Sequence, residues 1–157
     1  MSTFDIREVV GGSADHDAVL CLADDVLAQR RYVVANIPTA DDSHILGAFD
    51  ADGCAGFVRY YVQVIGAEEG RPPIVLRALP LREGFVEAFG VAPRARRSGI
   101  GTALQEAVRA RCRDIGCYQV RSRSPVGCVE NYAPKIVSGY GVHPSGEDDS
   151  YFFVKTL

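Results

Sequence analysis

The chain has 157 residues, of which 47% are hydrophobic and 24% charged. This balance is typical of a folded globular protein of one domain rather than of a disordered chain. The formal net charge of −3 gives no excess of lysine and arginine to neutralise a phosphate backbone, which argues against nucleic acid as a partner.

Neither a membrane segment nor a disulfide framework is indicated. No apolar run approaches the roughly 18 residues that a membrane helix needs, and residues 1–8 lack the apolar centre of a signal peptide. The five cysteines are scattered and odd in number, which argues against disulfides and against a zinc site. We therefore expect a cytoplasmic protein with reduced thiols and no metal.

The first third of the chain predicts a strand, a helix and a strand pair. Residues 4–10 have the pattern of a short strand, and Ser13 is suited to capping the helix that follows. Residues 45–49 and 54–65 are predicted strands joined by a hairpin. The helix is predicted from five apolar residues at helical spacing, which are Val19, Leu22, Ala23, Val26 and Leu27.

A strand, a turn and a helix are predicted after an irregular connection over residues 66–83. Residues 84–91 form the strand, residues 93–98 a basic turn, and Gly116 ends the helix. Residues 118–124 alternate as the next strand. A strand, crossover helix and strand of this length usually form a right-handed parallel unit.

The remainder predicts a short helix over residues 131–138 and a hairpin that pairs residues 140–143 with residues 151–157. The predicted fold class is therefore α/β. Its mixed sheet is flanked by helices, antiparallel at its start, parallel at the strand-turn-helix unit and closed by the C-terminal β-hairpin.

The turn Arg96-Arg97-Ser98-Gly99-Ile100-Gly101-Thr102 has the features of an anion site. Its two glycines allow close approach of a ligand, and the helix that begins there presents unpaired N–H groups and a positive dipole end. A tight turn with solvated arginines is the competing interpretation. The sequence satisfies neither the P-loop pattern nor the three-glycine dinucleotide pattern.

The segment Val91-Ala92-Pro93-Arg94-Ala95-Arg96-Arg97-Ser98-Gly99-Ile100-Gly101 resembles the signature of the GNAT acetyltransferase superfamily. That signature is R/Q-x-x-G-x-G/A at a helix start, after a strand that ends in Val-x-Pro. Similarity of motifs covers residues 84–140, and the order of strands and helices agrees over nearly the whole chain. The resemblance implies acetyl-CoA as the acyl donor.

The resemblance also implies which residues bind the donor. Backbone amides of the turn would hold the pyrophosphate, and the end of the preceding strand would pair with the pantetheine arm. Gly90 suits a bulge that splays this strand from its neighbour. Asn131 matches an asparagine that holds the arm, although a helix cap is an equal alternative. The implied donor-binding residues are Phe89, Gly90, Val91, Arg96, Arg97, Ser98, Gly99, Ile100, Gly101, Thr102 and Asn131.

Glu87 is the candidate general base. Amide formation needs an uncharged amine, and strand alternation places Glu87 on one face with Phe85, Phe89 and Val91, where burial would raise its pKa. The alternative is a strand carboxylate that reaches solvent or pairs with an arginine. The oxyanion donor implied by the resemblance is a backbone N–H near Val91.

The general acid is left open by the sequence. Many members of the superfamily place a tyrosine four residues before a Gly-Phe pair, and aligning that pair to Gly139-Tyr140 puts Lys135 in its place. Tyr132 is the candidate that we select, with Tyr140 as a second, although packing roles compete for both.

Other side chains have weaker indications. Arg121 and Arg123 share one face of a predicted strand and are candidates for lining the substrate or cofactor cleft, and surface pairing with acids is the alternative. Arg123 is the candidate for binding an anionic part of the acceptor. Cys128 is a lone cysteine, more often a packing residue than a nucleophile.

The predicted function is transfer of an acetyl group from acetyl-CoA to a primary amine of a small molecule or peptide, by direct attack. The alternative is a non-catalytic acyl-CoA-binding sensor or interaction module, which the lysine at the tyrosine position favours. The sequence carries no signal for the acceptor or the acyl-chain length. It is compatible with a homodimer without indicating one.

Overall fold

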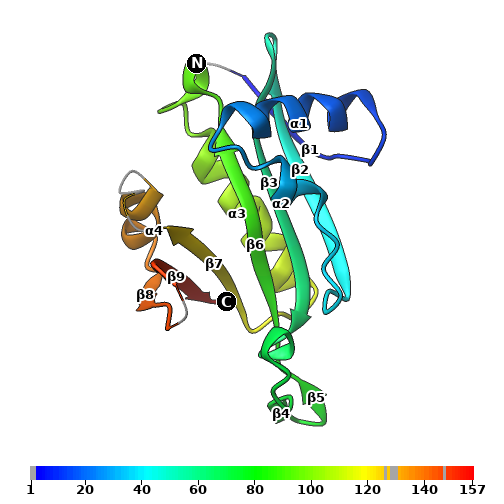
Figure 1. The fold of residues 1–157 in the computed structure, drawn as a ribbon, viewed down its shortest axis with the longest axis vertical. Helices are drawn as coiled ribbons and strands as arrows, with labels where there is room; N and C mark the ends of the chain where they lie inside the picture. Colours follow the sequence, from blue (N-terminus) through cyan, green and yellow to red (C-terminus); the bar gives the residue numbers. More distant parts are fainter. Residues whose placement is uncertain (1–2, 126, 128–130, 147) are drawn as a thin grey trace.

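The computed structural model describes residues 3–125, 127, 131–146 and 148–157 (Figure 1). A seven-stranded mixed sheet has the order β1-β2-β3-β6-β7-β9-β8, and a separate two-stranded sheet pairs β4 with β5. The strands are β1 (Asp5–Glu8), β2 (Asp42–Asp50), β3 (Gly53–Val64), β4 (Val75–Leu76), β5 (Leu79–Pro80), β6 (Arg82–Val91), β7 (Gln119–Pro125), β8 (Gly141–Pro144) and β9 (Ser150–Thr156).

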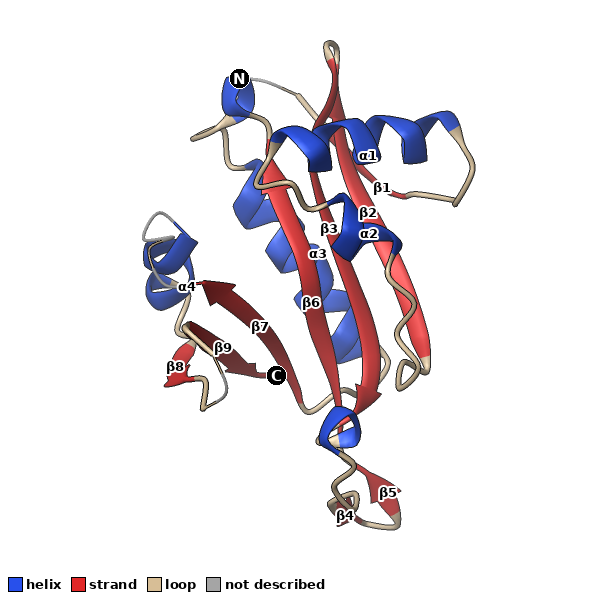
Figure 2. Cartoon of the chain, viewed as in Figure 1, coloured by secondary structure: helices blue, strands red, loops and turns tan. Residues whose placement is uncertain are grey.

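Helices cover the two faces of the sheet. Figure 2 shows α1 and α2 in front of the central strands and α3 behind them. Among the described residues, no helix has the length and apolar character needed to cross a membrane. The helices are α1 (Ala14–Asp25), α2 (Arg30–Val34), α3 (Ile100–Asp114) and α4 (Tyr132–Val137), with 3₁₀ turns η1 (Ala67–Glu69) and η2 (Pro93–Ala95).

Helix α1 forms where it was predicted but ends earlier. The Ser13 side chain accepts a hydrogen bond from the backbone N–H of His16, as expected of an N-cap. Val26 and Leu27 lie beyond the helix, and Leu27 is exposed, so the prediction that both continue the helix is wrong. The reason is a tight turn, because Leu27 and Ala28 have positive φ angles of 59° and 49° that redirect the chain into α2.

The connection over residues 66–83 contains more structure than expected. It holds η1 and the small β4–β5 hairpin, which projects from the body of the molecule in Figure 1. Strand β6 begins at Arg82, two residues before the predicted strand. Glu83 is therefore inside the sheet, and it is fully buried.

Strands β6 and β7 are parallel neighbours, as predicted, but they pair over only four residues. The last pair is Val86 with Ser122. Beyond it β7 stays paired with β9 and diverges from β6, as Figure 2 shows. The two strands therefore separate after Val86 and Ser122, and we call this opening in the sheet the splay.

The bulge that was predicted at Gly90 lies at Glu87 instead. Arg59 of β3 pairs with Ala88 and the next residue, Tyr60, pairs with Val86, so Glu87 is the extra residue. Gly90 stays in register. A Cβ at Gly90 would lie 2.8 Å from the Phe57 ring and 3.1 Å from Val26, so close packing explains this glycine.

The bulge also changes which residues share a face of β6. Phe89 and Val91 face α3, because a Cβ on Gly101 of that helix would lie 3.2 Å and 3.5 Å from their side chains. Phe85 stacks on Tyr61 on the opposite face. Glu87 shares that face with Phe85 and not with Phe89 and Val91, because an extra residue reverses the alternation.

Candidate active site

A pocket of about 550 Å³ lies at the N-terminus of α3, between the end of β6 and helix α4. Ser98 is the one predicted donor-binding residue that does not line it, and its hydroxyl instead donates a hydrogen bond to the Ala95 carbonyl. The predicted residues that line the pocket are Phe89, Gly90, Val91, Arg96, Arg97, Gly99, Ile100, Gly101, Thr102 and Asn131.

The turn before α3 has the geometry that an anion requires. Arg97 and Gly99 have φ angles of 64° and 86°, and this left-handed backbone folds the chain into a helix of 15 residues. The first N–H groups of α3 lack intrahelical partners, and the helix dipole adds positive charge there. The pocket therefore fits a pyrophosphate at this end.

The charge of the turn comes from fewer arginines than the sequence suggests. Arg94 donates to both carboxylate oxygens of Asp50, at 2.7 Å and 3.0 Å, and so is committed to the β2–β3 hairpin. Arg96 and Arg97 are exposed and line the pocket. These two arginines are the ones available to an anion.

Gln105 is a candidate donor-binding residue that sequence reasoning missed. It lies one turn into α3 from Gly101 and lines the pocket. Its amide nitrogen is the buried side-chain atom that has no hydrogen-bond partner among the described residues. Burying an unsatisfied donor is costly, so a ligand acceptor at this position would stabilise the site.

The predicted pairing edge of β6 is already partly occupied. The side-chain amide of Gln29 donates to the Phe89 carbonyl at 2.9 Å, and its oxygen accepts from the Phe89 N–H at 3.1 Å. The alternation of the β3–β6 ladder points the backbone groups of Val91 to the same side. A pantetheine arm that uses Phe89 must therefore displace Gln29.

Glu87 follows the last β6–β7 pair directly, so it lies at the apex of the splay. Burial raises the pKa of its carboxyl group, and the positive charges of Arg59 and Arg123 offset this only in part. A carboxylate with a raised pKa is a better proton acceptor near neutral pH. Its position and its pKa suit the predicted base.

Aromatic rings and arginines surround Glu87 on this face. The Arg121 guanidinium lies between the Phe85 and Phe152 rings, 4.7 Å and 4.8 Å from their centroids. Arg123 lies 4.9 Å from the Phe152 ring and pairs with Asp148 at 3.4 Å, with nearly half of its side chain exposed. Arg123 is thus within reach of a ligand as well as of Asp148.

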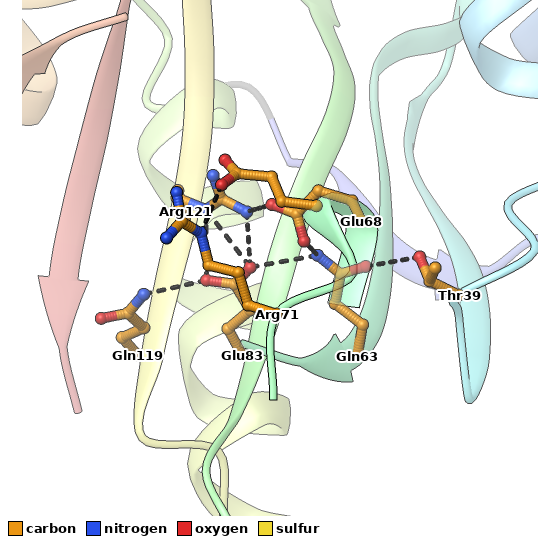
Figure 3. A network of polar contacts seen from close by, with 8 residues as sticks. Thr39, Gln63, Glu68, Arg71, Glu83, Gln119 and Arg121 are labelled. Atoms are coloured by element: carbon orange, nitrogen blue, oxygen red, sulfur yellow. Dashed lines mark hydrogen bonds and ion pairs between the residues drawn. The ribbon is translucent and has the colours of Figure 1, made fainter. Parts of the chain in front are cut away.

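Arg121 was predicted to line the substrate or cofactor cleft, but its guanidinium is part of a buried polar network. Its guanidinium binds the buried Glu83 at 2.7 Å and also contacts Glu68, and Gln63 and Gln119 donate to the same Glu83 carboxylate (Figure 3). This network joins β3, η1, β6 and β7 where the last two strands are still paired. It fixes the closed end of the splay.

The sequence matches a known protein family over most of its length. The model of the acetyltransferase (GNAT) family matches residues 18–125. The chain belongs to this family. The membership confirms the resemblance that the turn at Gly99 indicated.

A curated relative and two solved structures are similar to this GNAT chain. Aminoglycoside N(6')-acetyltransferase type 1 from Stenotrophomonas maltophilia is 40% identical over 57 residues, 36% of this chain and 37% of the relative. Arabidopsis thaliana NAA60, solved with acetyl-CoA, superposes with a TM-score of 0.75 at 15% identity, covering 99% of both chains.

A putative acyl-CoA N-acyltransferase from Klebsiella pneumoniae superposes with a TM-score of 0.71 at 18% identity, covering 98% of this chain and 97% of that one. The two structural likenesses confirm the predicted α/β fold with its mixed sheet. The matched part of the curated relative is little more than a third of its length.

The acid candidates of this GNAT chain differ in position. Tyr132 packs against the Tyr151 and Phe153 rings and does not line the pocket. Tyr140 lines it, but its hydroxyl accepts a hydrogen bond from Arg109 at 3.0 Å. Lys135, at the family's tyrosine position, lines the pocket as well.

The remaining sequence predictions concern Asn131, Cys128 and a metal site. Asn131 occupies the N-cap position of α4, but its side chain makes no capping hydrogen bond with the described residues, and it lines the pocket. Cys128 lies outside the described residues. Within the described part of the chain, no group of three or more His, Cys, Asp or Glu residues is placed to hold a metal.

Proposed function

We propose that the chain is an acetyl-CoA-dependent N-acetyltransferase that acetylates a primary amine of a small molecule or peptide. The observation that carries this proposal is the position of the donor pocket and of Glu87 relative to the splay. The donor pocket extends from the N-terminus of α3 past the end of β6 to Val26 and Leu27, and Glu87 lies outside it, at the point where β6 and β7 part. Donor and acceptor can then meet through the gap in the sheet.

The residues have distinct roles in this proposal. The backbone N–H groups of residues 99–102, with Arg96 and Arg97, bind the pyrophosphate of coenzyme A. Glu87 removes a proton from the acceptor ammonium, because only the neutral amine has a lone pair for attack. A backbone N–H near Val91 stabilises the charge that develops on the thioester oxygen.

Arg123 would bind an anionic part of the acceptor, in exchange for its weak contact with Asp148. An amine acceptor agrees with the name of the aminoglycoside relative, although the short match does not extend to its whole length. The cytoplasmic location, the single domain and the homodimer stay predictions from sequence.

A non-catalytic acyl-CoA sensor is the second candidate, and the lysine at the family's tyrosine position is the observation that favours it. The two candidates differ in whether an amine is consumed. Both bind acetyl-CoA in the same pocket, so binding alone does not distinguish them.

Release of free thiol from acetyl-CoA, measured across a panel of polyamines, aminoglycosides and peptides with a free N-terminus, tests the proposal. We expect amine-dependent release with formation of one acetylated amine per thiol. Calorimetric binding of acetyl-CoA without release by any amine would favour the sensor.

A further inference from the structure

Lys135 is a buried cation that contacts two hydroxyls and an aromatic ring. Its ammonium donates to the Ser122 and Ser124 hydroxyls, at 3.0 Å and 3.1 Å, and lies 4.9 Å from the Phe153 ring. Among the described residues no carboxylate pairs with it, and only 9% of the residue is exposed. A buried charge that is not neutralised destabilises a fold, so its presence in a pocket wall calls for a function.

The serines place Lys135 at the apex of the splay. Ser122 belongs to the last β6–β7 pair, and Ser124 lies two residues further along β7, on the same face. That face is the α3 face, because Val120 has the same alternation as the serines and a Cβ on Gly84 would contact both Val120 and Cys112 of α3. Lys135 therefore lies on the donor side of the splay, and Glu87 lies on the acceptor side.

We propose that Lys135 is the proton donor to the coenzyme A sulfur when the acetyl group is transferred. This inference rests on the proposed function. A bond forms between the amine nitrogen and the acetyl carbon, the carbon–sulfur bond breaks, and its electron pair goes to sulfur. Lys135 gives its proton to that sulfur. Glu87 first passes the proton of the ammonium to solvent and then accepts the second proton, which the nitrogen loses after attack, and exchange with solvent restores both groups.

The acidity of Lys135 suits this role. Burial lowers its pKa to about 8, close to the pKa of about 8.5 that is typical of a thiol. A lysine of ordinary pKa would hold its proton about a hundredfold more tightly than the leaving thiolate does. The other charged or titratable groups of the pocket are Arg96, Arg97, Arg109 and Tyr140, and no arginine can release a proton near neutral pH.

The composition of the chain is consistent with a specific need for lysine here. The sequence contains fifteen arginines and two lysines, Lys135 and Lys155. An arginine at position 135 would supply positive charge but not a transferable proton. Lys155 donates to the Ser138 carbonyl and does not line the pocket, so it serves as a matched control.

Ionisation of bound coenzyme A tests the contact without any turnover. The ultraviolet absorbance of the thiolate is followed against pH in the stoichiometric complex, with the complex of desulfo-coenzyme A as the blank for the protein's own cysteines. We expect the bound thiol to titrate about one pKa unit below the free thiol in the wild type, because the ammonium stabilises a thiolate. This shift should persist in Lys155→Met and disappear in Lys135→Met.

Kinetics test the proton transfer itself. Lys135→Met should lower kcat about 100-fold, with the KM for acetyl-CoA little changed. Lys135→Arg should keep the lowered thiol pKa but not restore kcat. The inference would be overturned if coenzyme A bound to the wild-type protein had the same thiol pKa as free coenzyme A. Full kcat in a folded Lys135→Met variant would overturn it as well. A lowered thiol pKa with no turnover of any amine would instead count against acetyl transfer, and with it against Lys135 as its acid.

Discussion

Glu87 can accept a proton only while its carboxylate is ionised. Because burial raises its pKa, the base is available above that raised value and is lost as the pH falls through it. We expect Glu87→Gln to lower kcat about 100-fold and to remove the acidic limb of the kcat profile. The affinity for acetyl-CoA should hardly change, because Glu87 does not line the donor pocket.

The matched control is Glu69→Gln, which alters a carboxylate that pairs with Arg71 on the exposed connection. Rates measured over a range of pH, together with calorimetric binding of acetyl-CoA, separate the two effects. Unchanged turnover in Glu87→Gln would remove this residue from the mechanism.

Single residues were predictable where the signal is local. The glycine turn, the Ser13 cap and the strand position of Glu87 follow from short patterns. The burial of Lys135 does not, because it depends on Ser122 and Ser124 from a strand more than ten residues away. No sequence pattern marks such a contact.

At the level of elements, Gln29 couples the α1–α2 connection to strand β6. Removing its two hydrogen bonds to Phe89 should lower the free energy of unfolding of Gln29→Ala by about 1–2 kcal/mol. The pantetheine arm would then meet no competitor, so coenzyme A should raise the melting temperature more in this variant than in the wild type.

Thermal unfolding with and without saturating coenzyme A measures this difference. A smaller rise in the variant would mean that Gln29 binds the coenzyme directly rather than giving way to it. Equal rises would mean that the arm does not use the backbone of Phe89.

The polar network at the closed end of the splay makes a second prediction at this scale. Glu83→Ala leaves the guanidinium of Arg121 without its buried partner, so the free energy of unfolding should fall by about 3 kcal/mol. Glu68→Ala removes the more exposed partner of the same arginine and should cost about 1 kcal/mol or less. Urea denaturation compares the two, and equal losses would contradict the assignment of Glu83 as the main partner.

The position of the bulge shows why element boundaries are harder to predict than elements. Gly90 is the residue that a local pattern selects, but the bulge depends on how β6 pairs with Arg59 and Tyr60 of β3. Pairing between distant strands carries no local signal. The early start of β6 at Arg82 was missed for the same reason, because the charged Arg82 and Glu83 find their partners elsewhere in the fold.

For the whole molecule, stability should depend on pH through His44. Burial opposes the charged imidazole, but hydrogen bonds with Glu8 and Asp42 outweigh it and raise the pKa. A raised pKa means that the stabilisation is complete below the unfolded value of about 6.5 and is lost as the pH rises through the folded value. Glu8 also binds Arg111 of α3, so the contact ties the sheet edge to that helix.

The free energy of unfolding, compared between the wild type and His44→Gln, checks this dependence. The wild type should exceed the variant by more at about pH 6 than at about pH 9. A difference that is constant over this range would contradict it.

The order of strands and helices was predictable over most of the chain because hydrophobic periodicity and turn residues agree along it. What the sequence could not supply is the side of the sheet on which each functional group lies. The bulge at Glu87 decides that, and it turns the predicted base away from the face on which Phe89 and Val91 pack against α3.

A crystal structure with coenzyme A bound tests the central claim most directly. The pyrophosphate should accept hydrogen bonds from the backbone of residues 99–102, and the sulfur should lie at the splay, within hydrogen-bond distance of Lys135 and with Glu87 across the sheet. A coenzyme bound outside this pocket, or one whose sulfur points away from the splay, would contradict the account.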